Sequence, residues 1–386
     1  MPSSPPVTIT REYKPSDWAI FTYNPESGKF ILGVSVLDTD VLGSTGGTIT
    51  KLDYAPTSII IDNGYENNGE VFWEFQPSTA TVQFNVADFD TPIAEKFIIG
   101  TDLIIALKTE QTTGDIPAIG AYDAYFTGFI SDFQATVTPS EKFSTFTISG
   151  TSNTQKMITK PFVIKGSNTV SMPNQMIQAG IDAYFGDLVT YPSSKYFINN
   201  FTATHTGAEF LSNYLAGSGY FWDDKTRVVL DNYQGKTVFS KTVTDADLFE
   251  IQLGWHNANN PIGAIWTNES TGVSISAGGV TVNDSSGGGI FSFTYNQDNV
   301  TNASYQNYRQ QFAPISVSMV VKQTFENISF DDNSSTWDEP FPKISDNLII
   351  DSTNLTIDGT YEVIGQQHFI DLERWTVKLN LRLKGL

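Results

Sequence analysis

Apolar and polar residues alternate without interruption near the end of the chain, from Trp375 to Leu383. A period of two residues is typical of a β-strand that buries one face. An extended run at 361–370, crossed by Gly365, precedes this strand, and the short segment 371–374 separates the two as a hairpin connection does. The apolar side carries Val377, Leu379, Leu381 and Leu383, and the polar side carries Thr376, Lys378, Asn380 and Arg382. The sequence therefore predicts a closing hairpin with a basic outer face.

Short apolar runs separated by Gly, Asn, Pro and Ser turns fill residues 7 to about 155 and return from about 253. In the first region only 91–99 hints at a short helix. Between the regions the spacing becomes helical, at Met172, Met176, Ile177, Ile181 and Phe185, and at Phe210, Leu211, Tyr214 and Leu215. A β-hairpin is predicted at 219–234, with its tip at 223–226. We therefore predict a mainly β fold, with barrel-like or sandwich-like β-domains at 1–160 and 253–386 and a small α+β module at 161–252.

The two strand-rich regions share an order of motifs. In the first, GTDLIIALK is followed by YDAYFTGFISDF and FSTFTISGT; in the last, SDNLIIDSTNLTIDG is followed by TYEVIGQQHFID and WTVKLNLRL. Each set predicts a strand, a strand crossed by a glycine, a turn and a further strand. Residue identity between the sets is slight, so the order of motifs is what indicates a duplicated β-unit.

Length and composition limit the class of protein. At 386 residues the chain is long enough for two or three domains, and 40% hydrophobic against 17% charged residues predicts a globular protein. There is no cysteine, which excludes disulfides, zinc-thiolate sites and thiol nucleophiles. The first residues show no secretory signal, and no apolar run approaches the roughly 20 residues of a membrane helix. We expect a soluble protein with no membrane segment, made in a cytoplasm.

The net charge of -20, from 42 acidic and 22 basic residues, argues against a protein that grips nucleic acid. Phosphate binding needs Lys and Arg to release counterions. The acid excess fits either a surface kept soluble by its charge or a surface that DNA passes without sticking.

Catalytic and metal-binding patterns are sparse. The three histidines, His205, His256 and His368, lie far apart in sequence, and no zincin, nucleophile-elbow, P-loop or dinucleotide motif occurs. Asp223 and Asp224 could supply half of a glycosidase carboxylate pair. Neighbours in a strand point to opposite faces, however, and this pair precedes Lys-Thr as ordinary hairpin-tip residues do, so we expect replacement of both by Asn to cost less than about 0.5 kcal/mol.

Two further groups of residues have a plain structural interpretation beside a functional one. The acidic loop at 331–339, with Asp331, Asp332, Asp338 and Glu339, could bind calcium through oxygen ligands, but it lacks EF-hand spacing and is typical of a solvated loop. The aromatic residues Tyr220, Phe221, Trp222 and Trp266 could stack on a sugar, although core packing is the default for such side chains. His368 is expected to be a hydrogen-bonded structural histidine. We predict no catalytic, cofactor or metal site.

Three motifs in order resemble one known family. FTGFISD at 126–132, followed by FTISGT at 146–151, resembles the first domain of bacteriophage tail hub proteins. GYFWDD at 219–224 with VVLD at 228–231 is similar to the α+β insert of that family. The end of the chain is similar to the end of the hub, at Tyr361, Val363 with Ile364, Gly365, His368, Trp375, Leu379 and Leu381. The resemblance spans nearly the whole chain.

The resemblance implies a structural virion protein, a minor tail or baseplate hub protein at the tail tip of a long-tailed phage, made in the host bacterial cytoplasm. In that family three chains, each with two tail-tube-like domains, form a pseudo-sixfold ring that continues the tail tube and leaves a channel for genome ejection. The implied partners are two further copies of the chain, the distal tail or tail tube protein, the tape measure protein, and tail fibre or receptor-binding proteins. DNA would pass without specific binding. Several hubs continue into lysozyme, peptidase or receptor-binding extensions, and the resemblance implies here a minimal hub that would leave cell-wall digestion and receptor contact to other tail proteins.

Two other functions remain open at this point. One is a carbohydrate-binding β-protein or phage adhesin, and the other is a distal tail protein built on the same tube fold. For a hub, cations on the channel wall would make the conduit sticky for phosphate. We therefore expect Lys378, Arg382 and Lys384 to be interface residues that face away from the lumen, toward acidic groups of a neighbouring chain or ring.

Overall fold

The computed structural model describes part of the chain and shows it to be mainly β. The described residues are 9–12, 15–24, 48–64, 75–86, 97–108, 122–138, 143–165, 189–190, 202–209, 211, 219–224, 227–232, 242–253, 263–268, 274–277, 290–295, 315–320, 322–326, 336–337, 341–353 and 359–383. Most of them lie in β-strands, and the helical segments are short. The predicted mainly β fold is confirmed.

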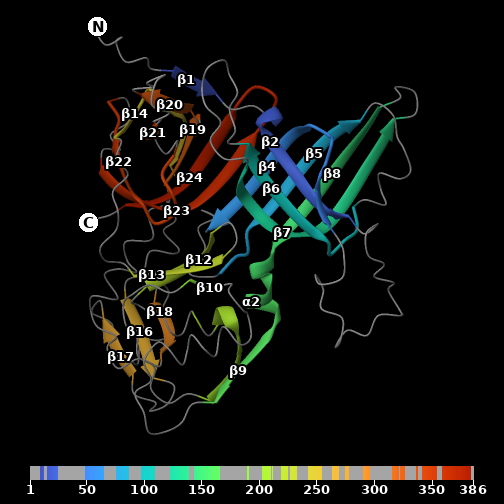
Figure 1. Ribbon diagram of the computed structural model, residues 1–386. Helices are drawn as coiled ribbons and strands as arrows, with labels where there is room; N and C mark the ends of the chain where they lie inside the picture. The colour runs from blue at the N-terminus through green and yellow to red at the C-terminus, as the bar shows by residue number, and fades with distance from the viewer. Residues whose placement is uncertain are drawn as a thin grey trace, which may run out of the picture.

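Strands from both ends of the chain form one large sheet. We call its N-terminal unit β2 (Trp18–Asn24), β3 (Thr48–Lys51), β4 (Pro56–Gly64), β5 (Thr79–Val86), β6 (Asp102–Lys108), β7 (Tyr122–Thr138) and β8 (Phe143–Ser152). The C-terminal unit comprises β14 (Val243–Thr244), β15 (Leu248–Leu253), β19 (Ile315–Val320), β22 (Asn347–Asp351), β23 (Gly359–Ile370) and β24 (Trp375–Leu383). The order is β15-β19-β24-β23-β4-β5-β8-β7-β6-β2-β3, with β22 beside β23 and β14 beside β22. The units lie side by side in Figure 1, in blue to green and in yellow to red.

The other described elements form smaller sheets and short helical segments. The smaller sheets pair β1 (Ile9–Glu12), β20 (Lys322–Glu326) and β21 (Thr336–Trp337); β9 (Pro161–Lys165) and β11 (Thr202–Thr206); β10 (Val189–Thr190), β13 (Arg227–Asn232) and β12 (Gly219–Asp224); and β17 (Ser274–Ala277), β16 (Gly263–Asn268) and β18 (Ile290–Tyr295). The described helical segments include η1 (Pro15–Asp17), η3 (Asn153–Gln155) and α2 (Lys156–Thr159). Within the described ranges, no helix is both long and apolar enough to span a membrane.

The two units of the large sheet share a strand register, which a β-bulge marks. Strands β7 and β8 shift register between Ile130 and Asp132, and β23 and β24 shift between Val363 and Gly365. A bulge places one extra residue in one strand, so it provides a fixed point for comparing two sheets. Matching these two bulges makes Ile130 equivalent to Val363 and Asp132 equivalent to Gly365.

A second bulge gives the same correspondence independently. Strands β4 and β5 shift register between Pro56 and Ser58, and β15 and β19 shift between Leu248 and Glu250. This bulge makes β4 equivalent to β15 and β5 equivalent to β19. Because β5 pairs with β8 and β19 pairs with β24, β8 is then equivalent to β24. The residue matches between β8 and β24 are the same as those given by the first bulge. The two units therefore have the same strand order and register over β4, β5, β6, β7 and β8 on one side and β15, β19, β22, β23 and β24 on the other.

The turn that precedes β6 and β22 is also repeated. Gly100 and Ser345 both have a positive φ, of 88° and 81°. The nitrogen of Gly100 donates to the carbonyl oxygen of Ile130, and the nitrogen of Ser345 donates to the carbonyl oxygen of Val363, both at 2.7 Å. A non-glycine residue with positive φ is uncommon, so the match is specific.

The repeat is structural rather than a repeat of particular glycines. Gly128 is equivalent to Tyr361, and Gly365 is equivalent to Asp132, so the glycines that cross the two predicted strands occupy different positions. A Cβ at Gly128 would lie 2.2 Å from the carbonyl oxygen of Thr151, which explains why that strand needs a glycine there. The units also differ in the direction of the strand that pairs with β6 or β22. Strand β2 runs antiparallel to β6, whereas β14 runs parallel to β22.

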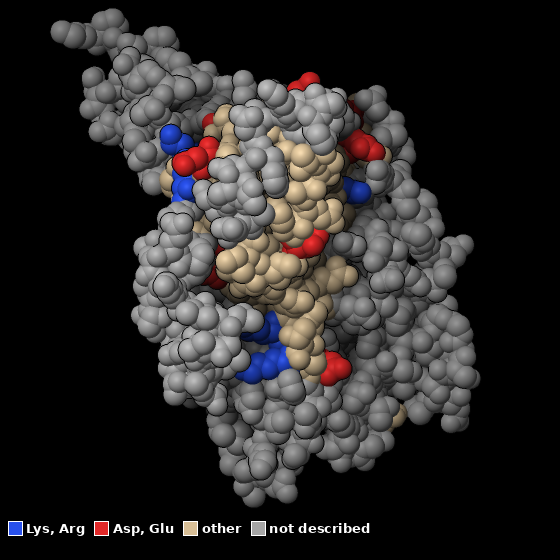
Figure 2. Space-filling model, turned by 90° about the vertical axis from the view of Figure 1, so that its right-hand side faces the viewer, with Lys and Arg blue, Asp and Glu red and all other residues tan. Residues whose placement is uncertain are grey.

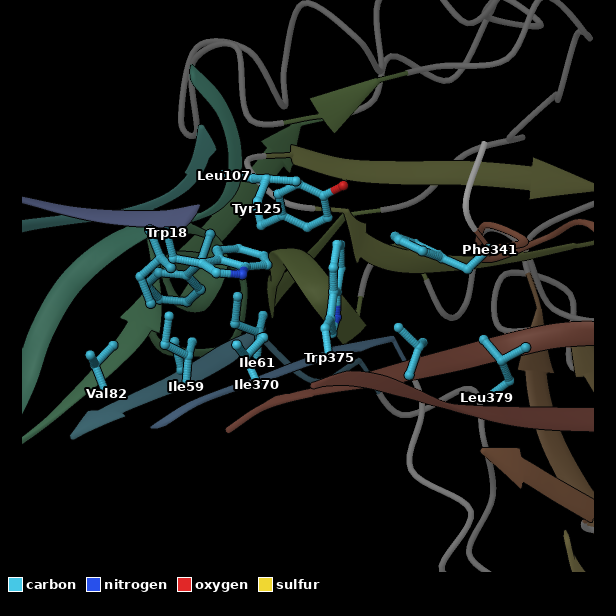
Figure 3. Close-up of a cluster of buried hydrophobic side chains, with 14 of the residues drawn as sticks. Trp18, Ile59, Ile61, Val82, Leu107, Tyr125, Phe341, Ile370, Trp375 and Leu379 are labelled. Atoms are coloured by element: carbon cyan, nitrogen blue, oxygen red, sulfur yellow. The ribbon is translucent and has the colours of Figure 1, made fainter. Parts of the chain in front are cut away.

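The units are joined by strand pairing and by a common core. The second half of β23 pairs antiparallel with β4, from Gly365 opposite Gly64 to Ile370 opposite Ile59. In Figure 3, Trp375 of β24 lies beside Trp18 of β2, above side chains of β4 and β23. The ring centroids of Trp18 and Trp375 are 5.0 Å apart in an edge-to-face contact. The structure therefore builds one core from both ends of the chain.

Some predicted elements are only partly described. Residues 97–99 of the expected helix at 91–99 are not helical and lead into a turn at 99–100. Residues 207–209 and 211 are helical as expected, and the expected helix around Met172 lies outside the described residues. Strands β14 and β15 begin before residue 253 in sequence but belong to the C-terminal unit of the sheet. The division into domains at 1–160, 161–252 and 253–386 stays a prediction.

Candidate functional site

The closing hairpin forms as the sequence predicts. Strands β23 and β24 pair along their length, and the side chain of Asp371 accepts hydrogen bonds from the backbone nitrogens of Glu373 and Arg374, at 2.8 and 2.9 Å. This is an Asx-type turn, in which a short carboxylate satisfies the turn's own backbone. Leu379 and Leu381 are fully buried, so the predicted apolar side faces the core.

The three cations proposed as interface residues are placed unequally. Lys378 is half-buried on the face opposite Leu379, with Ser318 of β19 on one side and Gln367 of β23 on the other. Because β24 has a strand on both sides, Lys378 can reach another chain only across the face of the sheet. Arg382 lies opposite Glu362 in the strand register, its side chain is outside the described part, and Lys384 lies outside the described residues. Their interface role stays a prediction.

The described charges do not form one continuous patch. Figure 2 shows a face on which the described acidic and basic side chains lie in separate small groups among uncharged residues. Binding that depends on phosphate neutralisation uses clustered Lys and Arg. The described part of this face therefore lacks the electrostatic footprint of a protein that grips nucleic acid.

The Asp223–Asp224 pair corrects one expectation. The hairpin of β12 and β13 forms, and its strands pair up to Asp224 opposite Arg227, but Asp223 is fully buried, whereas Asp224 is exposed. One oxygen of Asp223, Oδ2, accepts hydrogen bonds from the backbone nitrogen of Ser78 at 2.8 Å and from the hydroxyl of Thr154 at 2.6 Å. The expectation that Asp223 is an ordinary hairpin-tip residue is wrong, because this carboxylate attaches the hairpin to the N-terminal unit.

The surroundings of Asp223 also change its acidity. Burial raises the pKa of the Asp223 carboxyl above its ordinary value, and the hydrogen bonds from Thr154 and Ser78 partly oppose that shift. A raised pKa alone can accompany either catalysis or structure. Here the donors are a backbone amide and a hydroxyl that the carboxylate fixes in place, and sequence reasoning missed them because they lie 145 and 69 residues away in the chain.

His368 lies in an aromatic cluster rather than in an open site. The indole nitrogen of Trp375 donates to Nδ1 of His368 at 3.3 Å, and the histidine is 1% exposed. The rings of Tyr125 and Phe341 meet it edge-to-face, with centroid distances of 5.8 and 5.2 Å. The prediction of a hydrogen-bonded structural histidine is confirmed.

The other candidate groups are buried or outside the described part. Phe221 and Trp222 are 1% and 5% exposed, so neither offers a face for sugar stacking. The side chains of Tyr220 and Trp266 and the acidic loop at 331–339 lie outside what the structure describes. Within the described residues, no three His, Asp or Glu side chains are grouped as metal ligands.

Comparison with known proteins gives a likeness in fold. No family model matches the chain, and no curated protein sequence matches it. Among solved structures it is similar to the 43 kDa tail protein of prophage MuSo2 from Shewanella oneidensis, with a TM-score of 0.55, 12% identity, and coverage of 86% of this chain and 95% of that one. It is also similar to the tail protein from Neisseria meningitidis MC58, with a TM-score of 0.56, 9% identity, and coverage of 96% of both chains. The structural neighbours of this chain are therefore phage tail proteins, and the resemblance inferred from its motifs is confirmed at the level of the fold.

Proposed function

We propose that this chain is a structural protein of a phage tail, a hub that forms a ring at the tail tip. Three copies build a pseudo-sixfold ring that continues the tail tube and surrounds the channel for genome ejection. The fold of phage tail proteins supports the general role. The specific role, as a ring-forming hub, rests on the internal repeat.

The single observation that carries the proposal is the shared register of the two units. Two bulges and one turn occur at equivalent places in strands that precede residue 153 and in strands that follow residue 242. A chain with two equivalent units supplies six units from three copies. It can therefore adapt a sixfold tube to a threefold tip, which a single unit per chain cannot do.

The remaining parts of the proposal concern partners and chemistry. The ring contacts the distal tail or tail tube protein, the tape measure protein, and tail fibre or receptor-binding proteins, and it belongs to the tail tip of the virion. Its role is assembly without catalysis. The net charge of -20 supports passage of DNA without binding. Binding to DNA needs Lys and Arg side chains that neutralise phosphates and release their counterions, and an acidic protein has few of them to spare.

Light scattering after size exclusion, followed by electron microscopy of the particles, tests this function. We expect a trimer whose projection shows six similar lobes with threefold symmetry. Six chains per ring would instead support the distal tail protein. A monomer or dimer that binds a glycan array would contradict the hub and support the carbohydrate-binding alternative.

A further inference from the structure

The β12–β13 hairpin is attached to the N-terminal unit by side chains rather than by strand pairing. Strand β12 pairs with β13, with Asp223 opposite Val228, and within the described ranges no strand of the large sheet pairs with β12. It lies beside β4, and Figure 1 shows the hairpin just below the large sheet. The rings of Phe221 and Phe75 are stacked, with centroids 5.3 Å apart and an interplanar angle of 15°. The hairpin can therefore keep its own pairing when it leaves the unit.

The buried side chains of the hairpin are separate from the main core. Phe221, Trp222 and Val228 are buried, but none of them belongs to the hydrophobic cluster that joins the two units of the sheet. That cluster includes Trp18 and Trp375, which meet across the units. Loss of the hairpin contact therefore leaves the packing between the two units in place.

The two oxygens of the Asp223 carboxyl have unequal surroundings. Oδ2 accepts hydrogen bonds from the backbone nitrogen of Ser78, beside β5, and from the hydroxyl of Thr154, beyond the end of β8. Oδ1 is buried without a hydrogen-bond partner among the described residues, and so is the hydroxyl oxygen of Ser78. An ionised Asp223 would hold part of its charge on an oxygen without a donor, which costs more than burying the neutral acid. The geometry of the attached hairpin thus favours the neutral acid.

Charged neighbours in the described part do not explain the acidity of Asp223. The charged or titratable residues on the elements around it are Asp62 of β4, Lys156 of α2, Tyr220 and Asp224 of β12, and Arg227 and Asp231 of β13. Asp62 is half-buried, Lys156 and Asp224 are exposed, and the other three side chains lie outside the described part. Burial is the largest cause of the raised pKa of Asp223, hydrogen bonds partly oppose it, and no described charge contributes. The proton is therefore held because the hairpin buries the carboxyl.

We propose that Asp223 is a proton-operated latch, which holds the β12–β13 hairpin on the N-terminal unit as the neutral acid and releases it when the proton passes to solvent. The large sheet stays folded in both states. In the released hairpin the carboxyl is hydrated and has its ordinary pKa, so the attached hairpin binds the proton more tightly. Attachment is therefore strongest below the ordinary pKa and weakens about tenfold per pH unit as pH rises to the raised value. Release uncovers the rings of Phe75 and Phe221, and this switch does not depend on ring assembly.

Thiol labelling measures the release, because the natural chain has no cysteine. Val228→Cys places a thiol at a 0% exposed position of the hairpin, and Val82→Cys places one at a 0% exposed position of β5 in the large sheet. The reagent is dithiodipyridine, and the ratio of the two labelling rates cancels the pH dependence of the thiol itself. The ratio is followed from about pH 5 to about pH 8, above the ordinary pKa of an aspartate.

We expect the ratio of the Val228→Cys rate to the Val82→Cys rate to rise at least about tenfold over this range. Adding Asp223→Asn, which cannot ionise, should make the ratio constant, whereas the matched control Asp224→Asn, on the exposed side, should keep the rise. A constant ratio without these substitutions, or an equal rise with Asp223→Asn, overturns the latch. If circular dichroism shows that a cysteine variant is unfolded, hydrogen exchange of the β12 amides relative to the β5 amides gives the same test. That ratio should rise with pH in the natural chain and stay constant with Asp223→Asn, and any other result overturns the latch.

Discussion

The N-terminal and C-terminal units of the sheet are built alike but completed differently. Both contain five strands in one order, the same two bulges and the same turn, with Gly100 in one and Ser345 in the other. The C-terminal unit uses β4 of its neighbour to cover β23, whereas the open end of β7 has no described partner. The comparison teaches that a repeated fold need not have repeated surfaces, since each copy has a different neighbour in the chain.

The largest expected effect comes from the same change at two equivalent positions. Ile370→Ala should lower the free energy of unfolding by about 2–5 kcal/mol, because Ile370 is 1% exposed at the occupied junction. Val137→Ala should change it by less than about 0.5 kcal/mol in the isolated monomer, because Val137 is 44% exposed. Urea unfolding of both variants, at a concentration where the chain is monomeric, measures the difference. Equal losses would show that the two positions are not distinguished by a partner.

The second prediction concerns the glycine at the junction of the units. Gly64 has a φ of 74°, and a Cβ there would lie 2.7 Å from the carbonyl oxygen of Ile364. Gly64→Ala should therefore cost about 2–4 kcal/mol, from backbone strain and a clash with β23. Gly100→Ala is the matched control, since its φ is 88° but no atom lies within 4 Å of the added Cβ. Thermal unfolding should rank Gly100→Ala as the milder variant, and the reverse order would contradict the close approach at β4–β23.

The third prediction tests the attachment of the β12–β13 hairpin to the N-terminal unit. Asp223→Ala should lower stability by about 1–3 kcal/mol, because it leaves the buried amide of Ser78 without an acceptor. Asp224→Ala, one residue along on the exposed side, should cost less than about 0.5 kcal/mol. Denaturant unfolding distinguishes the two, and similar small losses would restore the original interpretation of an ordinary hairpin tip.

The acidity of Asp223 adds a dependence on pH. Because burial raises its pKa in the folded state, the folded chain binds this proton more tightly than the unfolded chain does. The stability contributed by this group is therefore complete below its ordinary pKa and is lost as pH rises through the raised value. Asp223→Asn keeps a hydrogen-bond acceptor and cannot ionise. As pH rises through the raised pKa of Asp223, the free energy of unfolding of this variant should therefore increase relative to that of the natural chain. A constant difference at all pH values would show that Asp223 does not titrate abnormally.

The sequence predicts local features of the fold well and distant contacts poorly. Alternation from Trp375 to Leu383 correctly identified the closing strand and its buried side, since each residue's face follows from its immediate neighbours. The order of motifs correctly indicated a repeat. It did not show which residues are equivalent, because a bulge such as that beside Ile130 adds a residue without a distinctive sequence.

The candidate site shows the same limit more clearly. Asp223 was assigned to a hairpin tip because its neighbours are typical of a turn, and its hydrogen-bond donors come from distant parts of the chain. Likewise, nothing near Gly64 or Gly365 in sequence indicates that these residues are opposed, although both halves of the sheet depend on that pairing. Non-local strand pairing is set by the packing of the whole core, which a local pattern does not contain.

The smallest expected effect concerns the cations of the closing hairpin. Replacing Lys378 and Arg382 by Glu should weaken ring assembly, most at low salt, without unfolding the monomer, since exposed ion pairs contribute about 0–1 kcal/mol each and are screened by salt. A ring repeats such pairs at every interface, so a small term per pair still affects assembly and register. The matched control replaces both residues by Gln, which removes the attraction without adding repulsion and should have the smaller effect. Light scattering over a range of ionic strengths measures both variants.

The position of Lys378 makes this test informative about the face of the sheet as well as its edges. Strands β19 and β23 occupy both sides of β24, so a partner for Lys378 must approach across the face opposite Leu379. If reversal weakens assembly at low salt, that face meets a neighbouring chain or ring, as the sequence-based expectation requires. If assembly is unchanged at every ionic strength, these cations are not interface residues.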